Sequence, residues 1–283
     1  MIWILNNCVL LIAGTLACVL GVSFYVRNRS SNGNIRYYIL LYGIFSALWC
    51  FCYAALGMTS ELSVCPYLRI PGLVAIDAFL INEVFVVTEM AGIKKRPSMI
   101  LRILFILISL VDLIVFSDTR VDIFVREDGY TRWYADPEMQ FNRNFHSIYE
   151  ALMFASLLIV AIIWLKKTNI KRSRKFLAIL FTANFSLVFF TIPDTVLPNF
   201  GLPGVATSGL GSAVCTIVMW YGATVFNSFD VSVGNITERL FDFIEAGVIV
   251  FDTDRHIRNN ERLRRKPPVG RQQKGSSGAV PHR

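Results

Sequence analysis

Long apolar blocks separated by short polar segments run along most of the chain. A helix needs about 20 apolar residues to cross the hydrocarbon core of a bilayer. Blocks of this kind occupy residues 2–26, 37–57, 70–91, 98–116, 147–165, 176–193 and 206–227. The first block has no basic start and is too long for a signal peptide, so we count it as a helix. The pattern predicts an all-α membrane protein, with a seven-transmembrane helix bundle over residues 1–227.

Basic residues indicate how this bundle is oriented. They cluster in the connections after the first, third and fifth blocks: Arg27, Arg29, Arg36, Lys94, Lys95, Arg96 and the segment KKTNIKRSRK (166–175). Short cytoplasmic loops carry an excess of Lys and Arg, so the N-terminus is predicted outside and the C-terminus in the cytoplasm. We therefore expect a multi-pass protein of the plasma membrane. The net charge of +8 follows this loop pattern, so no nucleic-acid partner is expected.

The connection over residues 117–146 differs from the others. It holds four arginines against six acids, which fits an external position. Apolar and polar residues alternate at Val121, Ile123 and Val125, and the alternation resumes after Asp128-Gly129. This pattern predicts a β-hairpin over the outer mouth of the bundle. An aromatic anchor at the membrane interface is the alternative.

Acidic residues inside the apolar blocks are candidates for function because a buried charge is costly in a membrane. The candidate ligand-binding residues are Asp77, Glu83, Asp112 and Glu150, together with Asp194 just past the end of the sixth block. Four of them fall in the predicted outer half, which would suit an unknown small cationic or hydrogen-bonding ligand. The alternative is structural, with the acids paired to Arg143, His146 or hydroxyl groups. Glu89 could instead contact Lys94 or Lys95 at the inner interface.

Several classes of site lack their residues in this sequence. The last block has no lysine for a retinal Schiff base. The three histidines, His146, His256 and His282, fall outside the predicted spans, so no His-Glu-x-x-His metal site is expected. We expect no cofactor, no metal site and no catalytic residues. A small transporter or channel using Asp77, Glu83 and Asp112 remains a rival to a receptor, although no inverted repeat is evident.

A different pattern follows the last block. Phe226, Phe229, Val233, Ile236, Leu240 and Phe243 recur at steps of three and four, as in the seam of a coiled coil. Residues 228–246 are thus predicted to form a cytoplasmic signalling neck that could pair in a homodimer. An amphipathic helix resting on the membrane or on the bundle is the alternative.

The layout resembles the seven-transmembrane N-terminal input region of bacterial sensor histidine kinases, which also occurs ahead of cyclic-dinucleotide synthases. LRIPGLVAIDAFLINEVFVV (68–87) looks most like this family, and GVIVFDTDRHI (247–257) is similar to the first hairpin of a PAS domain. The resemblance implies a signal-sensing module of a two-component system.

Residues 247–260 then read as an incomplete PAS-like start, and the basic tail 261–283 as disordered. No phosphoacceptor helix or ATP-binding domain fits in that tail. We therefore expect the chain itself not to be an enzyme, and residues after about 246 to be mobile.

Overall fold

The computed structural model describes residues 2–28, 35–90, 95–167 and 171–225. The predicted neck (228–246), the PAS-like start (247–260) and the basic tail (261–283) lie outside the described residues. The description below concerns the helical unit that precedes them.

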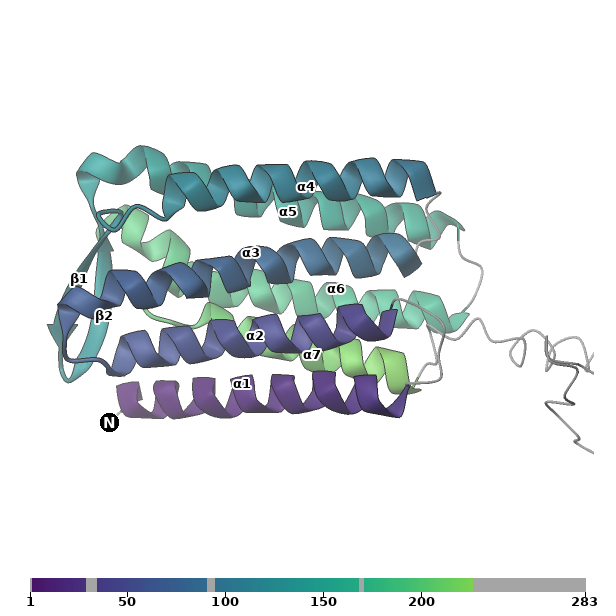
Figure 1. Cartoon of the computed structure of the whole chain (residues 1–283), viewed down its shortest axis with the longest axis horizontal. Coiled ribbons are helices and arrows are strands. Elements are labelled where there is room, and N and C mark those ends of the chain that lie inside the picture. The colour runs from purple at the N-terminus through teal and green to yellow at the C-terminus, as the bar shows by residue number, and fades with distance from the viewer. Residues whose placement is uncertain (1, 29–34, 91–94, 168–170, 226–283) are drawn as a thin grey trace, which may run out of the picture. The chain divides into compact units, whose positions relative to one another are not determined.

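Helices account for most of this unit. They are α1 (Ile2–Arg27), α2 (Ile35–Met58), α3 (Cys65–Met90), α4 (Lys95–Phe116), α5 (Gln140–Lys167), α6 (Lys171–Thr191) and α7 (Ser208–Val225). Six of them, α1 to α6, are long and apolar enough to cross a membrane. The unit is therefore a bundle of apolar helices suited to a bilayer, as the sequence predicts at this coarse level (Figure 1).

Five helices, α2 to α6, begin two to seven residues earlier than the apolar blocks predict. The helix α5 starts at Gln140, seven residues before the predicted span, and α3 starts at Cys65. The prediction that His146 lies outside every span is wrong, because His146 is buried within α5. Arg143 and His146 can occupy the first turns of α5 because both side chains are buried against other parts of the protein.

The predicted β-hairpin is confirmed. Strand β1 (Asp122–Glu127) pairs antiparallel with β2 (Tyr130–Ala135), and Glu127 lies opposite Tyr130. Asp128 (φ 51°) and Gly129 (φ 77°) form the two-residue connection. Positive φ at both positions is what a type I′ turn requires, and this turn matches the twist of the paired strands. Figure 1 shows the hairpin across the end of the helices where α1 begins.

The first two helices approach each other closely through glycine. A Cβ atom on Gly43 of α2 would collide with the backbone carbonyl of Ala17 in α1. The last helix, α7, packs against α1, α2 and α6. There Ser46 Oγ and Ser212 Oγ share a hydrogen bond of 2.8 Å, and Cys50 Sγ lies 3.1 Å from the carbonyl oxygen of Gly209.

Small residues and buried polar contacts therefore join the first helices of the unit to its last. By contrast, α5 and α6 touch each other at few positions.

Candidate functional site

Three charged side chains from separate elements meet beneath the hairpin. Asp122 of β1 accepts from Arg69 of α3 through Oδ2 (2.6 Å from Nε) and from Arg143 of α5 through Oδ1. All three side chains are at most 5% exposed. We call this group the arginine clamp. Because one carboxylate faces two guanidinium groups, the clamp carries a net charge of +1.

Both arginines also contact their surroundings. The guanidinium of Arg69 stacks over the ring of Phe116 at 4.1 Å. Arg143 donates from Nε to Asn199 Oδ1 (2.9 Å) and from Nη2 to the carbonyl oxygen of Thr195 (3.3 Å). These last two acceptors lie in the turns that follow α6, so the clamp connects the hairpin to the segment that leads into α7.

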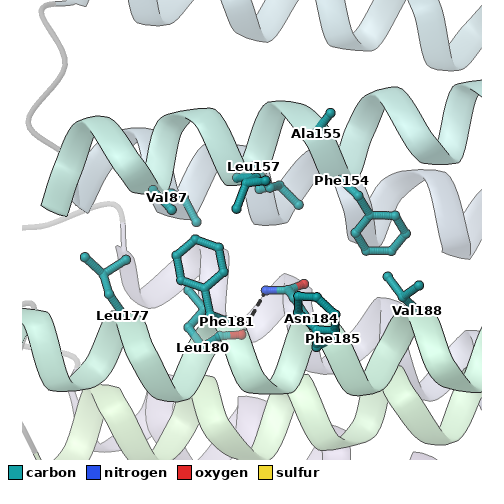
Figure 2. Close-up of a pocket in the computed structure, with 12 residues that line it drawn as sticks. Val87, Phe154, Ala155, Leu157, Leu177, Leu180, Phe181, Asn184, Phe185 and Val188 are labelled. Carbon is teal, nitrogen blue, oxygen red and sulfur yellow. Dashed lines mark hydrogen bonds between the residues drawn. The ribbon is translucent and has the colours of Figure 1, made fainter.

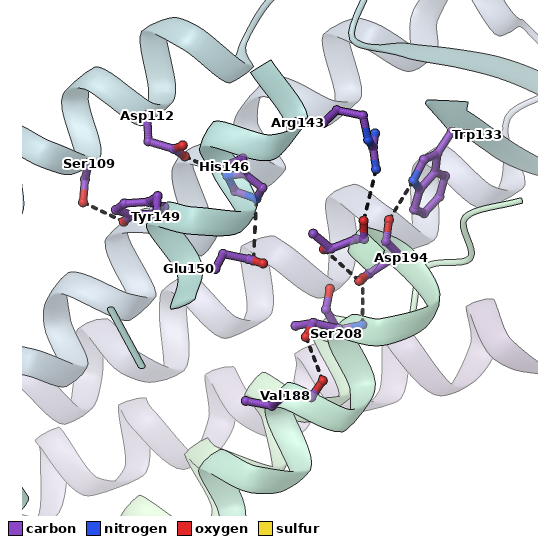
Figure 3. A network of polar contacts seen from close by, with 12 residues as sticks. Ser109, Asp112, Trp133, Arg143, His146, Tyr149, Glu150, Val188, Asp194 and Ser208 are labelled. Atoms are coloured by element: carbon purple, nitrogen blue, oxygen red, sulfur yellow. Dashed lines mark hydrogen bonds and ion pairs between the residues drawn. The ribbon is translucent and has the colours of Figure 1, made fainter. Parts of the chain in front are cut away.

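A second group surrounds His146. Its Nδ1 lies 2.8 Å from Asp112 Oδ2 of α4, and its Nε2 lies 3.6 Å from Glu150 Oε1 (Figure 3). The ring stacks on Phe116 with centroids 3.9 Å apart and planes 9° apart. We call Asp112, His146 and Glu150 the histidine cluster. Because His146 and Glu150 are four residues apart, both project from the same face of α5.

Asp77 of α3 lies beside the histidine cluster. It is 6% exposed and interacts electrostatically with His146 and Asp112. Within the described part of the chain, neither of its carboxylate oxygens has a hydrogen bond of normal geometry, and the Tyr149 side chain is a polar neighbour. An unsatisfied buried carboxyl group is costly, and it is a common feature of sites that bind or relay protons or cations.

Asp194 holds the start of α7. It lies on a π-helical turn, η3 (Ile192–Val196), and its Oδ2 accepts the backbone amide of Ser208 at 3.0 Å. Its Oδ1 accepts the hydroxyl of Thr195 at 3.2 Å, and its backbone carbonyl accepts Trp133 Nε1 of β2 at 3.0 Å. The backbone amide of Gly204 donates to the carbonyl of Trp133 at 2.7 Å. The hairpin and the first turn of α7 are therefore joined through one aspartate.

A small cavity lies between these groups. Its volume is about 20 Å³, enough for roughly one water molecule. Its charged lining residues are Arg69, Asp122, Arg143, His146, Glu150 and Asp194. The cavity brings the clamp, the histidine cluster and the α7 contact together in one place.

Glu83 lies apart from this site. It is six residues beyond Asp77 on α3, a rise of about 9 Å along the helix. Its Oε1 accepts Asn184 Nδ2 of α6 at 2.7 Å. Glu89 pairs with Arg102 at 2.8 Å, a partner that the sequence analysis did not consider.

The five predicted site residues are thus only partly grouped. Asp112 and Glu150 meet at His146, Asp77 lies beside them, Asp194 borders the same cavity and Glu83 is separate. The predicted structural partners His146 and hydroxyl groups are present, whereas Arg143 pairs with Asp122 of the hairpin. Asp122 and Arg69 were not predicted. Asp122 lies in a predicted loop and Arg69 just before an apolar block, and the sequence around neither residue indicates that its side chain is buried.

Outside the spans, the pKa values of Asp118 and Tyr130 are shifted. Arg120 donates hydrogen bonds to Asp118 and lowers the pKa of that carboxyl group to about 2. Burial raises the pKa of Tyr130, whose hydroxyl accepts Asn6 Nδ2 at 3.2 Å. Tyr130 therefore remains a neutral phenol that ties the hairpin to α1.

Neither a metal site nor a similar known protein identifies what this site does. Among the residues that the structure describes, no group of three or more His, Cys, Asp or Glu side chains is placed to hold a metal ion. Comparison of the chain with models of protein families and with curated proteins finds no match.

Proposed function

We propose that residues 1–227 form a seven-span membrane receptor module in the plasma membrane. In this proposal α7 is the seventh span, since its 18 described residues rise about 27 Å. The module receives a stimulus at the hairpin end and passes it through α7 to a cytoplasmic output. It would serve a two-component histidine kinase or a related PAS-linked signalling protein as its input part.

The connection between the hairpin and α7 carries this proposal. One route runs from Asp122 through Arg143 to Thr195, and the other from Trp133 through Asp194 to Ser208. The second route ends at Ser208, the first residue of α7, and the first ends at Thr195, beside Asp194 in the segment that leads into α7. A stimulus that displaces the hairpin or changes the charge balance of the cavity would therefore reach the start of α7 through Asp194.

The distribution of basic residues supports the orientation. In Figure 1, α1 ends and α2 begins away from the hairpin, and those ends carry Arg27 and Arg36. The start of α4 and the end of α5 lie there too, with Arg96 and Lys166. By the positive-inside rule this end is cytoplasmic, and the hairpin is outside.

A kinase fusion tests the receptor function. Residues 1–246 are placed in frame before the PAS and kinase domains of a two-component sensor, and autophosphorylation is measured in membrane vesicles. Trp133→Phe removes the donor to Asp194 and keeps an aromatic ring, so we expect the kinase rate to change severalfold at equal membrane content. Tyr134→Phe on the same strand is the control and should leave the rate unchanged. Equal rates for all three proteins would refute the receptor proposal.

The histidine cluster favours a second candidate function. A chain of carboxyl and imidazole groups, with Asp77 beside it, is the type of arrangement that relays protons in transporters. Purified protein in liposomes with an internal pH-sensitive dye separates the two functions. Dissipation of a pH gradient that is lost in Asp112→Asn would support a transporter or channel, and an undisturbed gradient would refute it.

A further inference from the structure

An apolar groove lies between α5 and α6, which contact each other at few positions. Its volume is about 240 Å³, and Val87 of α3 also lines it. Figure 2 shows side chains from both helices projecting into it. The larger lining residues are Phe154, Leu157, Leu158, Phe181, Phe185 and Val188. The groove has no counterpart among the predicted sites, and it does not overlap the cavity beneath the hairpin.

One polar side chain interrupts this apolar lining. Asn184 donates Nδ2 to Glu83 Oε1 (2.7 Å) and to the carbonyl oxygen of Leu180 (3.1 Å). Its Oδ1 has no hydrogen-bond partner among the described residues. Since its two donated bonds hold the amide in place, this oxygen is a fixed acceptor buried in the wall of the apolar groove, and a donor reaches it when a lining side chain moves aside. A lipid acyl chain has no donor with which to satisfy it.

We propose that this groove binds an amphiphile drawn from the bilayer, with an apolar body and one hydrogen-bond donor such as a hydroxyl group. The donor bonds to Asn184 Oδ1 and the body lies among the phenylalanine and leucine side chains. A dry apolar cavity of about 150 Å³ holds benzene, so the groove has room for a molecule roughly one and a half times that size. The biological meaning of this site rests on the proposed receptor function.

Occupancy of the groove has a route to α7. Glu83 is fully buried and interacts electrostatically with Tyr42 of α2 and Cys215 of α7. Because Asn184 donates to Glu83, a ligand that bonds to Asn184 Oδ1 polarises the same amide and strengthens the hydrogen bond that holds this carboxyl group. The groove is therefore linked to α7 through Asn184 and Glu83. The hairpin is linked to the same helix at its first residue, at a different depth in the bundle.

Photolabelling of the full chain in phosphatidylcholine nanodiscs tests the site. The probes are a ten-carbon alcohol bearing a diazirine and its methyl ether, which has the same apolar body but no donor. A single neutral hydrogen bond favours the alcohol by about fivefold in affinity. We expect the alcohol to label residues 154–161 and 177–188 about fivefold more than the ether at sub-saturating concentration. Unlabelled 1-decanol should compete.

Variants on one face of α5 locate the binding. Ala155→Phe and Leu158→Trp each fill the groove and should abolish competable labelling. Ala151→Phe makes the same change one turn away, outside the lining, and should label like the parent. Thermal unfolding midpoints show that each variant is folded.

Equal labelling by alcohol and ether, or labelling that 1-decanol does not reduce, would overturn the proposal in favour of ordinary lipid contact. Unchanged labelling in both groove-filling variants would overturn it as well. These outcomes are independent of the kinase fusion, which reads hairpin variants without any added amphiphile.

Discussion

Removing the negative charge at the centre of the arginine clamp should destabilise the protein strongly. Asp122→Asn keeps the size of the side chain but leaves Arg69 and Arg143 buried without their counterion. Each side chain is at most 5% exposed, so water cannot replace the lost carboxylate. Breaking a buried ion pair on one side costs about 3–5 kcal/mol. Against a total stability of roughly 5–15 kcal/mol, this is a large fraction.

The measurement is reversible unfolding of the full chain in mixed micelles, with rising SDS and tryptophan fluorescence as the signal. Asp118→Asn is the matched control because it makes the same substitution in a pair that faces solvent, where the Arg120 side chain is 71% exposed. The control should lower the free energy of unfolding by less than about 1 kcal/mol, because its ion pair is exposed to solvent. The charge argument also predicts the double variant. Arg143→Met combined with Asp122→Asn removes one stranded guanidinium, so its cost should be smaller than the sum of the single costs.

Two results would contradict this reasoning. A loss of under about 1 kcal/mol in Asp122→Asn, similar to the control, would show that the arginines are solvated and that the clamp is a surface pair. Strict additivity in the double variant would show that Asp122 and Arg143 do not interact energetically.

Three further predictions concern single features. Asp194→Ala removes the acceptor for the first amide of α7, so we expect a loss of about 1 kcal/mol and faster hydrogen exchange in the first turn of α7 alone; unchanged exchange there would contradict the capping role. Gly43→Val forces a branched side chain against the backbone of α1 and should cost about 1–3 kcal/mol in the same SDS titration. Asp118 should titrate at about 2 by NMR, and in Arg120→Ala its pKa should return toward 3.8. Because the folded pKa is depressed, the stabilising ion pair is complete above pH 3.8 and is lost as the pH falls toward 2.

The hairpin could be predicted because its signal is local. Asp128 and Gly129 tolerate positive φ, and the flanking residues alternate in polarity whatever the rest of the fold does. The apolar blocks could be predicted from local sequence as well, because a run of roughly 20 predominantly apolar residues is typical of a membrane-spanning helix.

The beginning of α5 could not be predicted in the same way. Residues 140–146 are mainly polar, and composition assigns such a segment to a loop. They are helical in the structure because Arg143 and His146 find Asp122 and Asp112 as buried partners. These partners come from 21 and 34 residues away in the sequence, and no periodicity within the segment indicates them.

The acids illustrate an intermediate case. Helix direction placed Asp112 and Glu150 at similar depth, and depth follows from the sequence. Whether they meet depends on the rotation of α4 and α5 about their axes, which packing decides. Glu83 is also an intramembrane acid, yet it faces α6 and the groove side of the bundle.

The contact of α7 with α1 and α2 has a consequence for biogenesis. In the proposed membrane module α7 is synthesised after the other six helices, so four helices are made between α2 and the helix that carries Ser212. During that interval the hydroxyl of Ser46 and the thiol of Cys50 face lipid or a temporary neighbour. Ser46 and Cys50 therefore acquire these partners only when the last helix is in place, so the contacts form late in assembly.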